Sequence, residues 1–360
     1  MYMKDKYFLV DVLRIVSKIQ ISDEEKNFLK RYFENITEDK FSILTLYRNR
    51  IEYLFAYHFF QISKEYKCDN KILKAYVRAI DSQIGYLQYK YEEYIHEITL
   101  LIDCLEKNNI RYVVLKGFSL MDELYKIDGI VYRNFTDCDF LIAKDDVAAV
   151  HKILTELDFA QGYIGLNNEI EYASRSEIIY WSMASHQEFP YIKKMKIQTN
   201  SPYKVVNIDV NTSILEGGLS KTMLSTGFIL EHRKKIKCGG TYCWGLSKEF
   251  QLIQLCYHFY KDTVYEAKIA THSSLTLIKF CDIREYLIIS KNSIDWELFL
   301  RLINEYGIAF KVLIALDMIA QYYSETELTQ LVNRLANASD VTLRKYDKDF
   351  WLQLIHCSYK

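Results

Sequence analysis

Apolar residues return every three or four positions along the first third of the chain, as at Ile72, Tyr76 and Ile80. This spacing places them on one stripe of an α-helix, where they can face a core. No proline interrupts the pattern between residues 7 and 107. We therefore predict that residues 1–107 form a helical N-terminal region.

After Asn108 the pattern changes to short, continuous apolar runs that are rich in β-branched residues, which is typical of buried strands. Between them lies an amphipathic segment with an acidic first turn, and a glycine pair indicates a hairpin. We predict a mixed α/β core over residues 108–245, with strands at 112–115, 138–143 and 205–210, short helices at 120–125 and 145–157, and a hairpin at 236–244.

Helical spacing returns at Ser247, with apolar residues at Leu252, Leu255 and Phe259, and it persists nearly to the end. This pattern predicts a helical C-terminal domain over residues 246–360. The expected fold class is therefore α+β, with a mixed sheet core flanked by helical regions on both sides in the sequence.

Half of the residues are hydrophobic and 15% are aromatic, which indicates a chain that folds almost entirely. Lys and Arg (46) nearly balance Asp and Glu (47), so the net charge provides no attraction for nucleic acids or anionic membranes, and we expect neither as a partner. The N-terminus lacks a cleavage-site pattern, and Lys311 and Asp317 interrupt the most apolar later stretch. We expect a cytoplasmic protein.

Eight cysteines are scattered along the chain, and without a secretion signal we expect reduced thiols. Cys238 and Cys243 are the closest pair, and they flank Gly239-Gly240. No second Cys or His pair lies near them in sequence, as a zinc site would need. A plain hairpin turn is the favoured interpretation.

Three acidic residues form the strongest candidate for chemistry. Asp137 and Asp139 are two positions apart at the start of a predicted strand, so both carboxylates point to one side. Like charges at that spacing repel one another unless a cation lies between them, and Mg²⁺ prefers such oxygen ligands. Asp209 lies on a later strand and could complete a site for two metal ions. The alternative is a solvated acidic turn.

Upstream, the first predicted strand ends in Lys116-Gly117, and Ser119 follows at the start of a helix. Backbone N–H groups in such a turn can bind a phosphate, and a glycine permits close approach. The same residues also suit an ordinary strand-to-helix turn. Taken alone, this segment does not distinguish the two interpretations.

In order and spacing, these segments resemble the nucleotidyltransferase superfamily (DNA polymerase beta-like fold), and more closely its family of poorly characterised bacterial nucleotidyltransferases. The resemblance covers roughly residues 96–310. Asn211 stands where family members often carry His, and the spacing from Gly117 to Asp137 exceeds that of the simplest superfamily members. The matching segments are Leu115-Lys116-Gly117, Arg133, Asp137-Cys138-Asp139, Ile208-Asp209-Val210 and the residues around His258, Lys279 and Asp282.

The resemblance implies transfer of a nucleoside monophosphate from an NTP to an acceptor, with release of pyrophosphate. It implies that Asp137, Asp139 and Asp209 bind Mg²⁺ or Mn²⁺, and that Asp209 helps to activate the acceptor. Arg133 has a structural ion pair as an equal alternative, and His258 an interface role. The residues expected to contact the nucleotide are Lys116, Gly117, Ser119, Arg133, His258, Lys261, Lys279 and Asp282.

The expected acceptor is a small molecule, a sugar phosphate or a peptide, because the balanced charge argues against nucleic acid. For the basic run 232–237, a solvated strand is favoured over acceptor contact. Two alternatives stay open for the whole chain. One is another phosphate or sugar transfer in a peptide natural-product pathway, and the other is a non-catalytic or toxin–antitoxin-type module on the same fold.

Overall fold

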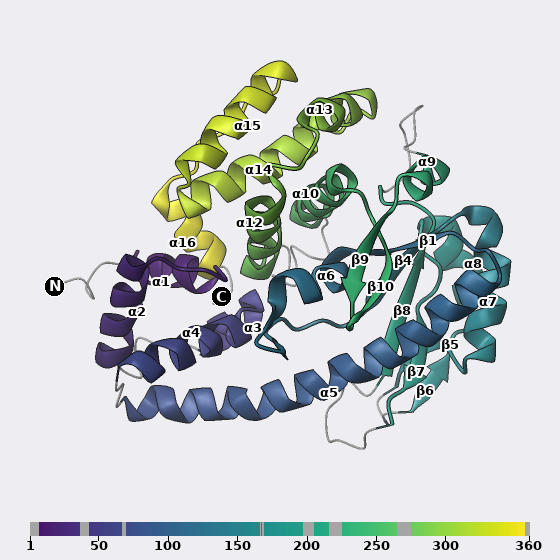
Figure 1. The fold of residues 1–360 in the computed structure, drawn as a ribbon, viewed down its shortest axis with the longest axis horizontal. Helices are drawn as coiled ribbons and strands as arrows, with labels where there is room; N and C mark the ends of the chain where they lie inside the picture. The colour runs from purple at the N-terminus through teal and green to yellow at the C-terminus, as the bar shows by residue number, and fades with distance from the viewer. Residues whose placement is uncertain are drawn as a thin grey trace. The chain divides into compact units, whose positions relative to one another are not determined.

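The computed structural model describes residues 7–36, 43–66, 70–165, 167, 169–196, 205–215, 225–264 and 275–356. The chain folds into two compact units that alternate along the sequence (Figure 1). The helical unit comprises residues 1–86, 124–134 and 255–360, and the sheet unit comprises residues 87–123 and 135–254.

The N-terminal part of the helical unit is built from short helices whose apolar stripes meet. The Ser22 hydroxyl and the Glu25 carboxylate cap the second helix reciprocally, which fixes where that helix begins. Phe33 packs edge-on against Phe55 and Phe59 in the core. The helices are α1 (Phe8–Val16), α2 (Asp23–Asn35), α3 (Ile43–Asn49), α4 (Glu52–Glu65) and the first half of α5 (Lys71–Lys107).

The C-terminal helices complete the helical unit around a second aromatic cluster, in which Phe280 packs against Phe259 and Tyr322. The predicted helices at both ends of the chain are thus confirmed. They are α10 (Lys248–Val264), α12 (Leu277–Ser290), α13 (Trp296–Glu305), α14 (Ala309–Tyr323), α15 (Thr326–Ala338) and α16 (Lys348–His356), beside the small hairpin β2 (Lys126–Ile127) and β3 (Ile130–Val131).

The sheet unit contains an eight-stranded mixed sheet in the order β6-β5-β7-β8-β4-β1-β10-β9. The three strands and the glycine hairpin predicted from the sequence are all present, and the sheet adds three strands that the sequence pattern did not predict, β5, β6 and β7. The strands are β1 (Tyr112–Leu115), β4 (Cys138–Ile142), β5 (Ala160–Ile164), β6 (Ile170–Tyr172), β7 (Tyr191–Lys194), β8 (Val205–Asn211), β9 (Lys234–Cys238) and β10 (Thr241–Gly245).

The second half of α5 covers one face of this sheet (Figure 1). The Tyr94 hydroxyl lies 2.9 Å from the Thr136 carbonyl oxygen and 3.0 Å from the Asn207 backbone nitrogen, so one buried side chain ties the helix to both central segments. Gly239 has φ +62°, and a Cβ there would collide with Ile95 of α5. Glycine is therefore required at this turn on two counts.

The connections of the sheet unit are short helices. The predicted segment 120–125 is a π-helical turn that follows the short α6, and the predicted helix 145–157 is present as a 3₁₀ turn leading into α7. These elements are α6 (Lys116–Ser119), η3 (Met121–Tyr125, which continues into the helical unit), η4 (Lys144–Asp146), α7 (Val147–Glu156), α8 (Arg175–Ala184) and α9 (Thr226–Glu231).

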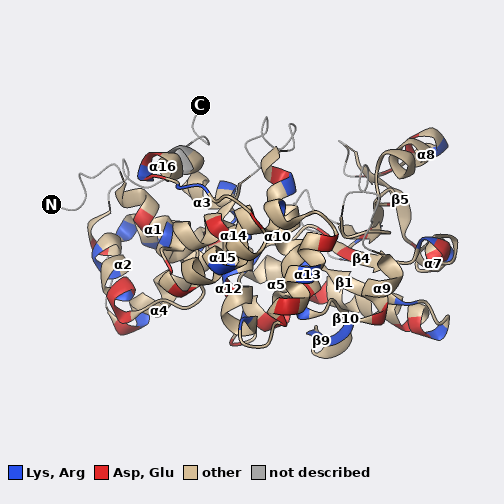
Figure 2. Ribbon diagram, turned by 90° about the horizontal axis from the view of Figure 1, so that it is seen from above, with Lys and Arg blue, Asp and Glu red and all other residues tan. Residues whose placement is uncertain are grey.

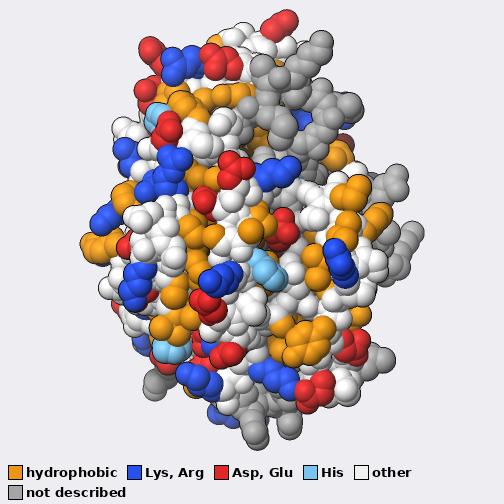
Figure 3. All heavy atoms as spheres, turned by 90° about the vertical axis from the view of Figure 1, so that its right-hand side faces the viewer, with side chains coloured by type: hydrophobic (Ala, Val, Ile, Leu, Met, Phe, Trp, Pro, Cys, Tyr) orange, Lys and Arg blue, Asp and Glu red, His pale blue; other side chains and the backbone are white. Residues whose placement is uncertain are grey.

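Helix α8 buries none of its residues, although its sequence is largely apolar. Tyr180 and Met183 are 75% and 83% exposed. Figure 3 views the side on which α7 and α8 lie in Figure 1, and exposed apolar side chains are visible there among charged ones. Within the described residues, no helix is both long enough and apolar enough to cross a membrane.

The six cysteines that the structure describes are free, as expected. Cys68 and Cys357 lie outside the described residues. Cys238 ends β9 and Cys243 lies in the middle of β10, on either side of the hairpin turn, in line with the hairpin interpretation.

Candidate active site

Strand pairing in the sheet unit brings the predicted carboxylates together. β4 lies between β1, which runs antiparallel to it, and β8, which runs parallel. In this register Asp139 is the direct partner of Asp209 on β8 and of Leu115 on β1. Paired residues point to the same face of a sheet, and Asp137 precedes Asp139 by two positions. Asp139 and Asp209 therefore share one face, opposite the side of Cys138, and the charge of Asp137, just before β4, acts on both of them.

Lys116 joins this group from the end of β1. Its Nζ lies 2.5 Å from Asp139 Oδ1, and the Asp139 side chain is only 4% exposed. The backbone of Lys116 has φ +54°, a left-handed conformation that costs a non-glycine residue free energy. The Lys116 backbone N–H donates to Gln254 Oε1 at 3.2 Å, which holds the turn in this conformation.

The electrostatics of the acidic group follow from burial and mutual repulsion. Burial raises the pKa of Asp139, opposed by Lys116, while Asp137 raises it further. Burial also raises the pKa of Asp209 well above its usual range, and the charges of Asp139 and Asp137 add to that effect. Lys116 responds in the opposite sense: burial would lower its pKa, but the attraction of Asp139 and Asp137 outweighs burial and raises it.

Asn211 contributes a neutral donor to the same group. Its side-chain amide donates to Asp139 Oδ1 at 3.2 Å and to the backbone oxygens of Phe140 and Asp209. The position where the sequence departs from the related family thus orients Asp139 through a hydrogen bond. Asn211 lies two residues after Asp209 on β8, so strand periodicity alone places it on the acidic face.

One buried atom indicates that a cation fits here. Asp209 Oδ1 is inaccessible to solvent and has no hydrogen-bond partner, which is costly for a carboxylate oxygen. Across the described parts of the chain, no three His, Cys, Asp or Glu side chains are already arranged to hold a metal ion. The Lys116 ammonium lies against Asp139 instead. A divalent cation bound by Asp139 and Asp209 would therefore displace that ammonium and satisfy the Asp209 oxygen.

The turn after β1 is braced by the first residues of α10. The Ser119 hydroxyl is buried and donates to the Lys116 carbonyl oxygen at 2.6 Å, and it also lies 3.3 Å from Gln251 Oε1. Gln251 and Gln254, three positions apart on one helix face, were not identified from the sequence. Their spacing was the available signal. The phosphate-binding roles of Gly117 and Ser119 stay predictions.

In the helical unit, Arg133 and Asp282 form a buried ion pair. Arg133 Nε and Nη2 donate to the two carboxylate oxygens of Asp282 at 2.9 and 2.7 Å, and the Tyr125 hydroxyl donates to Oδ1 at 2.5 Å. The guanidinium also lies 5.3 Å from the Tyr125 ring centre. The structure thus contains the structural ion pair that was the alternative to nucleotide contact for Arg133.

A second polar cluster of the helical unit connects α10 and α12. Asp262 Oδ2 accepts a hydrogen bond from Lys279 Nζ and lies 3.6 Å from His258 Nδ1. Asp262 was not identified from the sequence, although it follows His258 by one helical turn. His258 and Lys279 are therefore brought together by Asp262, and Lys261 precedes it in the chain. Nucleotide contact by His258, Lys261, Lys279 and Asp282 stays a prediction.

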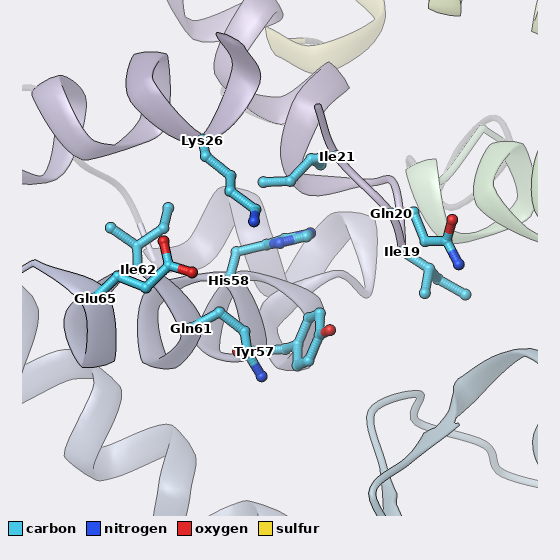
Figure 4. Close-up of a pocket in the computed structure, with 9 residues that line it drawn as sticks. All are labelled: Ile19, Gln20, Ile21, Lys26, Tyr57, His58, Gln61, Ile62 and Glu65. Atoms are coloured by element: carbon cyan, nitrogen blue, oxygen red, sulfur yellow. The ribbon is translucent and has the colours of Figure 1, made fainter. Parts of the chain in front are cut away.

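The helical unit also contains a cavity of about 290 Å³ between α2, α4 and the segment that joins α1 to α2 (Figure 4). Polar residues such as Lys26, Gln61 and Glu65 line it, and none of the predicted site residues does. His58 also lines it, is only 2% exposed, and has its Nε2 2.7 Å from the Lys18 carbonyl oxygen.

Two buried residues of α4, His58 and Glu52, change the free energy of unfolding with pH in opposite directions. Burial lowers the pKa of His58 to about 4, so its contribution to stability is lost as pH falls from 6.5 towards 4. Burial raises the pKa of Glu52 to about 7, so its contribution is lost as pH rises from 4.5 to 7. The two effects oppose each other over the shared range.

We expect Glu52→Gln to expose the histidine response. Its free energy of unfolding should fall by about 3 kcal/mol between pH 6.5 and 4, because only the unfolded state then gains a proton at His58. Urea denaturation across this range measures the effect. Glu65→Gln, an exposed position on the same helix, is the control and should retain the flatter wild-type profile. A flat profile in Glu52→Gln would contradict the assignment.

A buried carboxylate pair on adjacent parallel strands, behind a Lys-Gly turn in a mixed sheet, is an arrangement suited to metal-dependent transfer of phosphate-containing groups. Residues 46–324 match the protein family described as uncharacterised nucleotidyltransferase. Because the match spans well over half of the sequence, the chain belongs to this family, and nucleotidyl transfer is the activity that the family supports. Comparisons with curated proteins and with solved structures gave no significant match.

Proposed function

We propose that the chain is a Mg²⁺-dependent enzyme that transfers a nucleoside monophosphate from an NTP to an acceptor hydroxyl. The observation that carries this proposal is the unsatisfied Oδ1 of Asp209, buried beside Asp139 on the neighbouring strand. A buried carboxylate oxygen without a partner costs stability, even though Gln187 hydrogen-bonds to the same carboxylate, and a metal site would explain that cost. Family membership supports the same chemistry.

In the proposed reaction, the acceptor hydroxyl oxygen forms a bond to the α-phosphorus of the NTP. The bond from that phosphorus to the bridging oxygen breaks, pyrophosphate leaves with the bonding electrons, and the hydroxyl proton passes to solvent. Asp137, Asp139 and Asp209 would hold the divalent ions, whose positive charge would offset the charge on the attacking and leaving oxygens. Asn211 orients Asp139 through its hydrogen bond.

Lys116 has two roles in this proposal. Without metal, its ammonium balances the charge of Asp139 and so keeps the acidic group folded. If a metal took its place at Asp139, the flexible Lys116 side chain could instead reach an anionic phosphate of the NTP. The turn that carries Lys116 and Gly117 is held by Gln254, so the backbone stays in place while the side chain moves.

The test is pyrophosphate release and NTP binding by the purified full-length chain. We expect release with at least one NTP across a panel of sugar-phosphate, peptide, small-molecule and oligonucleotide acceptors, and loss of release when EDTA removes the metal. Calorimetry should show NTP binding that requires Mg²⁺ or Mn²⁺. If no NTP binds with either metal and no pyrophosphate appears with any acceptor, the proposed function is wrong.

A further inference from the structure

The β9–β10 hairpin presents cations and aromatic rings on the same sheet face as the proposed metal ligands. Val114 of β1 pairs with both Phe140 and Gly245, so these three residues lie on one face of the sheet. Asp139 is next to Phe140 in its strand, and Trp244 is next to Gly245, so both lie on the other face. Tyr242, two positions before Trp244, lies on that face as well. Trp244 pairs with Lys235 of β9, and Tyr242 pairs with Lys237. Alternation along the strands therefore places all four side chains on the acidic face.

We call Arg233, Lys235, Lys237, Tyr242 and Trp244 the basic–aromatic strip. Arg233 and Lys235 lie 4.5 and 5.5 Å from the Trp244 ring centre. Tyr242 is 61% exposed, and Lys235 and Lys237 are exposed as well. Figure 2 shows the blue of basic residues at β9. Lys235, Lys237 and Tyr242 are therefore accessible, while Arg233 and Trp244 are half-buried.

The cations of the strip are not neutralised by nearby acids. Within the described residues, Lys235 and Lys237 form no ion pair, whereas Arg233 Nη1 donates to the Leu230 carbonyl oxygen at 3.1 Å and its Nε is buried without a partner. Glu231 and Glu106 are engaged elsewhere, since Glu231 lies 3.7 Å from Arg111 and Glu106 accepts a hydrogen bond from the Tyr112 hydroxyl. Several positive charges thus remain available to an external anion.

Protection of a sheet edge explains only part of this pattern. β9 is an edge strand, and lysines on edge strands discourage pairing with other chains. That role does not require an exposed Tyr242 beside the lysines, and it leaves the opposite edge strand, β6 (Ile170–Tyr172), without any lysine. Rings interleaved with unpaired cations instead suit a ligand that carries both phosphates and flat bases.

We infer that the basic–aromatic strip binds a single-stranded nucleic acid, whose phosphates contact Lys235 and Lys237 while a base stacks on Tyr242, and that this strand supplies the acceptor hydroxyl. The inference rests on the proposed nucleotidyl transfer. It replaces the expectation, drawn from the balanced net charge, that nucleic acid is not a partner. The local arrangement of charge, rather than the total, determines contact with a strand.

The position of the strip relative to the carboxylates suits this role. In the sheet order, β9 is three strands away from β4, a separation of about 14 Å at the usual strand spacing. Arg233 and Trp244 lie at the end of the hairpin nearest the level of Asp139, and Tyr242 lies further along. A strand that follows the strip can therefore place its terminal hydroxyl beside the carboxylates.

The experiment measures binding of a fluorescein-labelled oligouridylate of about twelve nucleotides, within the usual site size for such proteins, by anisotropy with the full chain and Mg²⁺. We expect Lys235→Glu/Lys237→Glu to weaken binding at least tenfold and to reduce the salt dependence by about 1.4 in the log–log slope. Tyr242→Ala should weaken binding about tenfold. Lys152→Glu, an exposed lysine on α7 with a 78% exposed side chain, is the control and should bind as wild type.

The same variants separate this inference from the proposed function. All of them should bind NTP with Mg²⁺ as wild type does, and extension of the oligouridylate should fall with its binding. NTP binding and pyrophosphate release without any oligouridylate binding would overturn the inference alone. Equal weakening by Lys152→Glu, or binding of polyglutamate in place of the oligonucleotide, would also overturn it, the latter in favour of an acidic peptide.

Discussion

Replacing Asp209 with Asn is expected to abolish nucleotidyl transfer while leaving the protein at least as stable as wild type. In the proposed site this carboxylate would bind metal, so its loss should lower kcat by about 10³-fold. Its Oδ1 has no partner in the fold, and burial already raises its pKa well above the usual range. Removing this charge should therefore raise the free energy of unfolding, by about 1 kcal/mol.

Asp139→Asn provides the contrast that makes this prediction specific. It should lower activity to a similar degree, but it should also lower stability, because Asp139 pairs with Lys116 and accepts from Asn211. Asp145→Asn, at an exposed position just after β4, is the control and should change neither property. Urea denaturation and pyrophosphate release measured on the same preparations decide the matter. A large loss of stability in Asp209→Asn with activity retained would contradict the proposed site.

The acidic group was accessible to sequence analysis because it depends on local periodicity. Two aspartates two positions apart at the start of a strand must share a face, whichever strands lie beside them. That Asp209 lies directly opposite Asp139 was not accessible, because the sequence pattern does not specify which strands become neighbours. The ion pair of Lys116 with Asp139 was missed for the same reason, since the sequence indicated only a phosphate-binding turn or an ordinary strand-to-helix turn there.

The strands β5 to β7 were missed because their sequences lack a clear two-residue alternation. β6 has only three residues and is mostly exposed, and β7 has buried residues only in its first half. The sequence of helix α8 shows no apolar stripe that would face a core, because none of its residues is buried. Short, half-exposed elements are fixed by pairing with neighbours, here with β8, rather than by their own pattern.

The alternation of the two compact units along the chain also escaped prediction. Residues 124–134 leave the sheet unit and pack within the helical unit, although the flanking segments carry the proposed active site. The sequence shows only a short loop with a glycine there. The ion pair between Arg133 and Asp282 belongs to this excursion, and its partners are 149 positions apart. Contacts at such separations leave no local signature.

Arg133→Ala is expected to be among the most destabilising single changes in the helical unit. It would leave the Asp282 carboxylate buried, with a side chain 7% exposed, and without its bidentate partner. The free energy of unfolding should fall by about 3–5 kcal/mol. Burial would lower the pKa of Arg133, but the charge of Asp282 outweighs burial and raises it, in keeping with a strong pair.

The choice of matched variants distinguishes a structural role from nucleotide contact. Asp282→Asn with Arg133→Met removes both charges and should recover much of the stability, because no buried charge then remains unpaired. If the ion pair is structural, NTP affinity in the folded fraction should stay within about twofold of wild type. Such a change is well below the tenfold change in affinity that corresponds to about 1.4 kcal/mol. If Arg133→Ala instead kept its stability and lost NTP binding, the nucleotide-contact role would be correct. Because the guanidinium already donates two hydrogen bonds to Asp282, the structure favours the first result.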